Sequence, residues 1–140
     1  MKARPVEGLS PGAPLRPNAA RIVATRIGEL RALAEPALDP AASTAQHDLR
    51  IAAKRLRYVL EITEVCFGPE AKAARRAAKD LQGVLGEIHD CDVMLPRAWG
   101  IESLRDLLRT RRELLFRRFL ELWREHDEGG TWAALERALH

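Results

Sequence analysis

The chain has 140 residues and a net charge of +3, and 46% of its residues are hydrophobic while 31% are charged. These proportions exclude an intrinsically disordered chain, and the length suffices for one domain that buries a core without disulfides. No apolar run is long enough to span a bilayer or to form the core of a signal peptide, and Cys66 and Cys91 form no paired motif. We therefore expect a cytoplasmic protein with no membrane partner.

The expected secondary structure is helical throughout. Alanine, leucine and arginine are abundant and only 5% of the residues are aromatic, which favours helices packed through small and aliphatic side chains. Residues 1–16 are rich in proline and glycine and predict a flexible leader, whereas residues 17–140 are expected to form a single bundle. Helices are expected at about residues 17–35, 43–67, 70–95, 101–127 and 131–140. Their short connections predict an all-α fold, an antiparallel four-helix bundle with a short C-terminal helix.

A row of basic side chains follows one face of the second expected helix. Ser43 and Gln46 have the spacing of a capping box, which places the row close to the start of this helix. The row consists of His47, Arg50, Lys54 and Arg57, within roughly 80° of one another around the helix axis. A strip formed by Ile51, Tyr58 and Ile62 lies beyond the row, on the side away from the core stripe. Charges between two apolar margins indicate a groove or a surface that faces a partner, and a solvated basic face is the simpler alternative.

The third expected helix carries a second basic face. Its cations are Lys72, Arg75, Arg76 and Lys79. Gly83 and Gly86 continue the same face, and each glycine inside a helix costs about 1 kcal/mol relative to alanine. Two glycines there indicate that a ligand or another backbone approaches closely, and plain helix packing through small residues explains them equally well.

Two arginines of the fourth expected helix fall within its apolar arc. Arg111 and Arg118 fall in the middle of this arc. The arc consists of Leu104, Leu107, Leu108, Leu114, Leu115, Phe119 and Leu122. A buried guanidinium without a partner is very unfavourable, so each must pair with a carboxylate, extend to solvent or face a polar cavity. Both are therefore additional candidates for a binding site.

Enzymatic chemistry is the main alternative to a binding role. Histidine precedes aspartate at residues 47–48, 89–90 and 126–127, but neighbours on a helix point about 100° apart, so each pair offers one ligand and predicts neither a metal site nor a cofactor. His47 with Arg50 one turn later has the form of a phosphoacceptor site on a helical bundle. The positive charge extends over several turns and two helices, however, which suits a long polyanion better. A His/Asp metal-dependent phosphohydrolase is the least favoured alternative.

Nucleic acid would use the same cations, because phosphates dominate the affinity of such complexes. Base recognition needs aromatic side chains or a groove-reading motif, and Tyr58 is the only aromatic residue close to the basic row. Phosphates without bases therefore describe the expected ligand, and specific nucleic-acid binding is not expected.

Two segments carry a family resemblance, HDLRIAAKRLRY at residues 47–58 and LQGVLGEIHDCD at residues 81–92. In this order and at this separation they resemble the CHAD family, a histidine-containing α-helical domain that binds inorganic polyphosphate. The resemblance covers about residues 18–128 and implies a non-enzymatic module of the cytoplasm or of polyphosphate granules. The binding residues that it implies are His47, Arg50, Lys54, Arg55 and Arg57, with Lys72, Arg75, Arg76 and Lys79 on the neighbouring helix.

The chain differs from the family in size. CHAD domains resemble two such bundles in tandem with their basic faces turned toward each other, whereas this chain has one copy of the motif. It therefore binds as a half-site, or two chains pair to rebuild the two-bundle arrangement. We expect a homodimer, because the strip of Ile51, Tyr58 and Ile62 would otherwise be exposed beside charge.

Overall fold

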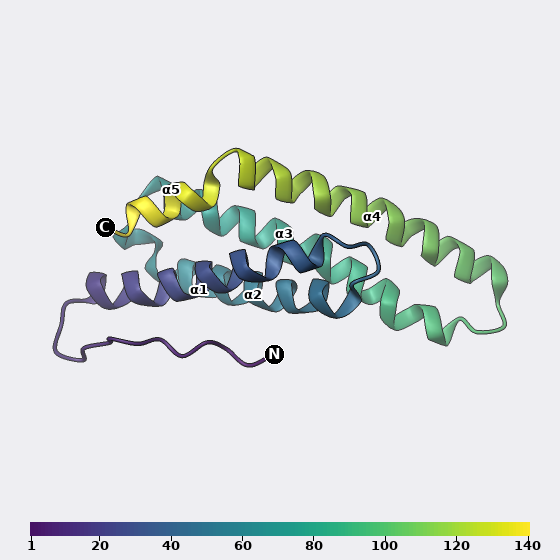
Figure 1. Ribbon diagram of the computed structural model, residues 1–140, viewed down its shortest axis with the longest axis horizontal. Helices are drawn as coiled ribbons and strands as arrows, with labels where there is room; N and C mark the ends of the chain where they lie inside the picture. The colour runs from purple at the N-terminus through teal and green to yellow at the C-terminus, as the bar shows by residue number, and fades with distance from the viewer.

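The computed structural model describes all 140 residues, and its regular secondary structure is entirely helical (Figure 1). The elements are α1 (Leu15–Ala37), α2 (Ser43–Thr63), the short 3-10 helix η1 (Glu64–Cys66), α3 (Pro69–Arg97), α4 (Glu102–Glu128) and α5 (Thr131–Ala138). α2 packs between α1 and α3, α4 packs along α3, and α5 folds back onto α3. The expected all-α class and helical bundle are confirmed. None of the helices is long and apolar enough to cross a membrane.

The helix ends follow local chain chemistry. Gly68 precedes α3 with φ of 81°, a conformation that favours glycine, and Pro69 then occupies the first turn, where its missing N–H is not needed. α1 continues past the expected end at residue 35 to Ala37, and its last turn accommodates Pro36. α2 is shorter than expected, since the chain tightens into the 3-10 helix η1 after Thr63.

The expected capping box at the start of α2 is wrong. Ser43 is already the first helical residue, the N-cap is Ala42, and no side chain caps the helix. The Gln46 side chain is buried, and its amide donates a hydrogen bond of 2.8 Å to the carbonyl of Asp39 in the preceding turn. Gln46 therefore ties α2 to the α1–α2 connection instead of closing its own helix end.

The core is one cluster of 27 buried residues. Small residues line the contact of α2 with α3, where Ala52, Ala53, Ala74 and Ala78 are at most 1% exposed. Large residues from the last part of the chain complete the core; Phe119, Trp132 and Leu135 are also at most 1% exposed. The small residues let the backbones of α2 and α3 approach closely, which places their basic side chains beside each other.

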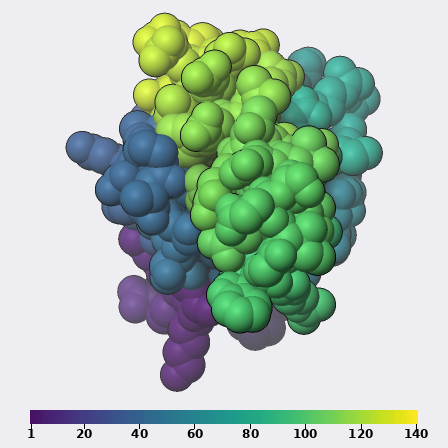
Figure 2. Space-filling view, turned by 90° about the vertical axis from the view of Figure 1, so that its right-hand side faces the viewer, coloured from purple at the N-terminus to yellow at the C-terminus, as the bar shows by residue number.

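The buried face of α4 contains Leu108, Phe119 and Leu122 of the expected arc but excludes other members of it. Leu107 and Leu114 are 63% and 58% exposed, whereas Phe116, Phe119 and Trp123 face inward. Burying the aromatic rings removes more apolar surface from water than burying the two leucines would, so the helix is rotated toward the aromatic side. The α3–α4 end of the molecule, seen face-on in Figure 2 with the first turns of α4 in front, consequently presents apolar side chains to solvent.

Residues 1–14 contain no helix, and the leader runs alongside α1 (Figure 1). A buried carboxylate holds it: the Arg4 backbone N–H donates to Glu29 over 3.2 Å, and Arg26, which is paired with Glu29, donates to the Arg4 carbonyl. No residue of the leader belongs to the core cluster. The division of the chain near residue 16 stays a prediction.

Candidate functional site

A groove lies between α2 and α3 and has a cavity volume of about 360 Å³. None of the residues that line it is hydrophobic. They are Arg50 and Arg57 of α2 with Lys79, Gln82, Gly83, Gly86, Glu87 and Asp90 of α3. The packing of the two helices thus brings together the two predicted basic faces. Arg50 and Arg57 come from the row on α2, and Lys79 comes from the basic face of α3.

The two glycines have different roles in this α2–α3 groove. A Cβ atom at Gly86 would lie 3.3 Å from Arg50 Nε, so the missing side chain leaves room for the Arg50 guanidinium to lie against α3. A Cβ at Gly83 would meet nothing within 4 Å, so Gly83 contributes bare backbone to an open part of the wall. Plain helix packing, the alternative considered for these glycines, does not describe either position.

The arginines of the groove are pre-positioned but retain free hydrogen-bond donors. The Nε atoms of Arg50 and Arg57 are buried and have no hydrogen-bond partner. The Arg57 guanidinium lies 4.5 Å from the centre of the Tyr58 ring, and its Nε is 3.7 Å from Glu61, a distance that leaves it without a hydrogen bond. Lys54 is exposed, and its Nζ lies 5.8 Å from the centre of the same ring. Tyr58 thus restricts two cations without neutralising them.

The other basic residues of α3 lie outside the α2–α3 groove. Arg75 donates a 2.5 Å hydrogen bond to Glu64, and Lys72 lines a separate cavity at the α2–α3 turn with the same glutamate. Arg76 is exposed. Lys79 is therefore the only cation of this face that lines the groove, and Lys72 and Arg76 continue the positive charge beyond it toward the start of α3.

Arg55 points to another part of the molecule. Its guanidinium donates to the Met1 carbonyl over 2.6 Å and lies 3.5 Å from Glu29, whose side chain is 3% exposed. Arg55 therefore anchors the leader to α2 and does not line the groove. If Arg55 contacts polyphosphate, as the sequence predicts, the contact must form on a surface of the protein outside the groove.

Arg111 and Arg118 are both exposed, on the side of α4 that also carries the exposed Leu107 and Leu114. Two of the three arrangements expected for them are present, since Arg111 pairs with a carboxylate and Arg118 is exposed to solvent. Arg111 donates a 3.1 Å hydrogen bond to Glu87, which lines the groove, so Arg111 borders the site on the side of α4.

The inward-facing arginine of α4 is Arg112, whose importance the sequence pattern did not indicate. Its side chain is 14% exposed, and it donates to Asp92 over 2.5 Å, to the Gln46 side chain over 2.7 Å and to the Pro40 carbonyl over 2.9 Å. The aromatic residues Phe116, Phe119 and Trp123 were the signal that could have identified it, since they define the inward face of α4.

His47 and His89 stack at the end of the α2–α3 groove, with ring centroids 4.2 Å apart and an angle of 21° between the rings. His47 Nδ1 is buried and has no hydrogen-bond partner. Burial lowers the pKa of His47 most strongly, and His89 and Arg50 lower it further, while Asp48 opposes them. No three His, Cys, Asp or Glu side chains lie close enough together to hold a metal ion.

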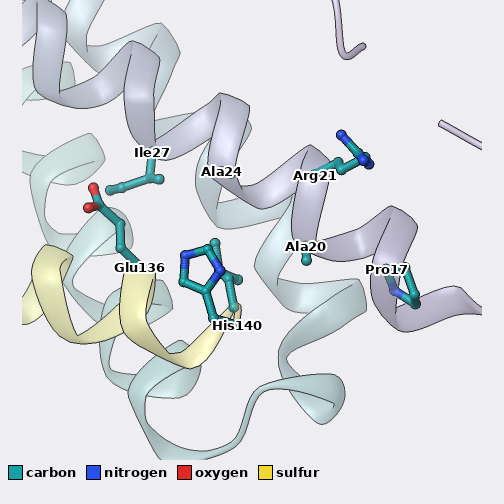
Figure 3. Close-up of a pocket in the computed structure, with 8 residues that line it drawn as sticks. Pro17, Ala20, Arg21, Ala24, Ile27, Glu136 and His140 are labelled. Atoms are coloured by element: carbon teal, nitrogen blue, oxygen red, sulfur yellow. The ribbon is translucent and has the colours of Figure 1, made fainter. Parts of the chain in front are cut away.

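A second cavity, of about 520 Å³, lies between α1 and α5 (Figure 3). Half of its lining residues are hydrophobic, and none of the residues predicted to bind an anion lines it. Its one carboxylate, on Glu136, is already paired with Arg31 over 2.7 Å, and Arg21 points away from the cavity in Figure 3. Arg21 is thus the only arginine or lysine that lines this cavity, whereas Arg50, Arg57 and Lys79 line the α2–α3 groove.

The fold and groove together define a helical protein with a polar, cation-bearing site between two adjacent helices. A family model described as the CHAD domain matches residues 2–99, more than half of the chain. The chain belongs to the CHAD domain family. The match includes the leader and both groove helices and ends before α4, whereas the resemblance was expected over residues 18–128. Comparison with curated proteins and with solved structures gives no match.

Proposed function

We propose that this chain binds inorganic polyphosphate, or a similar polyanion, without catalysis in the α2–α3 groove. The observation that carries the proposal is the convergence of Arg50, Arg57 and Lys79 on a cavity that no hydrophobic residue lines. Guanidinium groups bind successive phosphates through paired N–H donors, and Lys79 adds a compact charge. Membership of the CHAD domain family supports this function at the level of the family.

The charges around the groove give the proposed ligand a direction. Glu87 and Asp90 line the groove on the Gly86 side and would repel phosphates that extend beyond Arg50. Lys54, Lys72 and Arg76 are exposed and extend the positive charge in the opposite direction. A polyanion would therefore leave the groove past Lys79 toward the start of α3, and affinity should rise with chain length until these outer cations are reached.

The first prediction concerns two arginines of the groove. Arg50→Ala combined with Arg57→Ala should lower the affinity for long polyphosphate by about 100-fold or more, because charge-assisted hydrogen bonds contribute about 1.5–3 kcal/mol each. Calorimetric titration with polyphosphate of graded length measures the loss, and circular dichroism checks that the helices persist. Binding by the unaltered chain should also weaken steeply as salt is added.

A matched control removes the same charge elsewhere. Arg109→Ala combined with Arg124→Ala changes two exposed arginines of α4 that do not line the groove. This control should retain most of the affinity. An equal loss in both double variants, or equal affinity of the unaltered chain for duplex DNA and polyphosphate, would mean that the protein has only a general basic surface.

A histidine phosphotransfer protein is the second candidate, and the unpartnered His47 Nδ1 is the observation that favours it. This function predicts an acid-labile phosphoryl group on His47 after incubation with a phosphodonor. The stack with His89 and the burial of Nδ1 restrict access to the ring, which favours the binding function instead.

Pairing of two chains is a further part of the proposal. Tyr58 and Ile62 are 45% and 76% exposed beside the groove, so a second copy could cover them and bring a second row of cations opposite the first. Analytical ultracentrifugation with polyphosphate present should then show a dimer. A monomer at high protein concentration would contradict the pairing and leave a half-site. Polyphosphate of the cytoplasm, including its granules, is the proposed ligand in the cell.

A further inference from the structure

The stacked histidines are connected to the α2–α3 groove through their neighbours in sequence. Arg50 follows His47 by one turn of α2, and Asp90 follows His89 directly in α3; both of these neighbours line the groove. The two rings face each other across the helix contact, 4.2 Å apart. A change of charge in the groove therefore changes the electrostatic potential at the histidine pair.

The groups around His47 favour the neutral ring in the absence of a ligand. On α2, Arg50 disfavours a proton and Asp48 favours one. His89 of α3 and the amino group of Met1 also disfavour it, and burial is the largest effect, so the pKa of His47 lies below its ordinary value.

The nearest inward charge of α4 is already neutralised. Arg112 contacts Gln46, the residue before His47, but is paired with Asp92. The balance at the histidine pair is thus set mainly by burial, by the two rings and by Arg50.

A bound polyanion changes this balance. Phosphates that contact Arg50 offset its charge, and their own negative charge favours a positive ring next to the groove. The His47 Nδ1 has no hydrogen-bond partner and is therefore available to take up a proton. Because the rings are stacked, two positive charges on the pair would repel each other strongly, so the pair takes up one proton from solvent in total.

We propose that the stacked His47–His89 pair couples polyanion binding in the α2–α3 groove to the uptake of one proton, so that binding strengthens as the pH falls. This inference rests on the proposed function. It assigns the two histidines a common regulatory role that neither would have alone.

Calorimetric titration with long inorganic polyphosphate in two buffers of different ionisation enthalpy tests the coupling. The internal phosphates of the polymer are strong acids whose charge is constant near neutral pH, so a buffer-dependent heat reports protons taken up by the protein. We expect uptake approaching one proton per site. Affinity should rise by roughly tenfold for each pH unit over which a full proton is taken up, and therefore by roughly 10- to 100-fold between about pH 8 and about pH 6.

Histidine variants identify where the proton goes. His47→Asn and His89→Asn should each remove most of the proton uptake, whereas the control His126→Asn should retain it, because His126 contacts Thr131 at the far end of α4. Binding without proton uptake by the unaltered chain would overturn the coupling. Full proton uptake in both His47→Asn and His89→Asn would also overturn it. Absence of any binding would instead overturn the proposed function, and the coupling with it.

Discussion

Arg112 holds three segments of the chain together through one guanidinium group. It connects α4 to Asp92 of α3, to Gln46 of α2 and to the Pro40 carbonyl before α2. These partners accept hydrogen bonds from most of the N–H groups of Arg112. The positive charge of Arg112, which is largely shielded from water, is therefore compensated by Asp92. Arg111, the residue before Arg112, has a single carboxylate partner, the exposed Glu87. Neighbouring arginines of one helix thus have different structural importance.

Replacing Arg112 should therefore be far more damaging than replacing Arg111. Arg112→Ala leaves Asp92 and Gln46 without their partner and should lower the free energy of unfolding by about 3 kcal/mol. Arg111→Ala removes an exposed ion pair and should cost less than about 1 kcal/mol. Urea unfolding followed by circular dichroism measures both. Similar losses in the two variants would contradict the assigned role of Arg112.

His47 should make the stability of the free protein depend on pH. Its folded-state pKa is lower than the ordinary value of 6.5, so below about pH 6.5 the unfolded chain binds a proton that the folded chain resists. The stability that His47 contributes is present above this pH and is lost as the pH falls. Between about pH 7.5 and pH 5.5, urea unfolding of His47→Asn should therefore show a shallower loss of stability than that of the unaltered chain. An unchanged slope would show that His47 titrates normally in the folded state.

At the scale of the helices, the sequence predicts α2 and α3 better than α4. The basic row of α2 and the glycines of α3 could be predicted because the core stripe of each of these helices is clear from its period. α4 has apolar residues on two sides, Leu107 and Leu114 on one and Leu108 and Phe116 on the other, so periodicity alone does not decide which side is buried.

The positions of Arg55 and Arg75 could not be predicted for a related reason. Each belongs to a basic run of its helix, but its direction depends on a carboxylate from another element, Glu29 for Arg55 and Glu64 for Arg75. A helical period places a side chain on a face and does not reveal the acidic partner that crosses to it. Three-dimensional neighbours therefore decide which basic residues keep a free charge.

Gly83 gives a prediction in which stability and binding change in opposite directions. Gly83→Ala should stabilise α3 by about 0.5–1 kcal/mol, because alanine is the better helix former and its Cβ meets nothing within 4 Å. The same methyl group projects into the open groove and should weaken polyphosphate binding. Thermal unfolding and calorimetric titration of one variant measure both effects. Unchanged affinity would mean that the ligand does not approach the backbone at Gly83.

At the scale of the whole molecule, the helices that follow the family match are needed for the core. The match ends at residue 99, yet Phe119 of α4 and Trp132 and Leu135 of α5 are among the most deeply buried residues. Both helices pack against α3, and α5 also contacts α1. The segment that carries the groove therefore depends on the rest of the chain for its stability.

A fragment of residues 1–99 should accordingly fail to fold cooperatively. Removing α4 and α5 exposes buried surface of α3, and losing even one large aromatic residue from a core costs about 3–5 kcal/mol, a large part of the stability of a small domain. Thermal denaturation followed by circular dichroism compares the fragment with the full chain. A sharp transition at the same midpoint would show that α1, α2 and α3 suffice.

The three tryptophans offer separate optical reports on this molecule. Trp123 and Trp132 are buried with ring centroids 6.0 Å apart, whereas Trp99 is 82% exposed at the α3–α4 turn, and none of them lines the α2–α3 groove. In a Trp99→Phe variant, fluorescence would come only from the buried pair and would shift to longer wavelength when the core opens to water. The emission would then report unfolding and would not change when a ligand occupies the α2–α3 groove. Tryptophan emission would thus report the stability of the same sample whose affinity is measured by calorimetric titration.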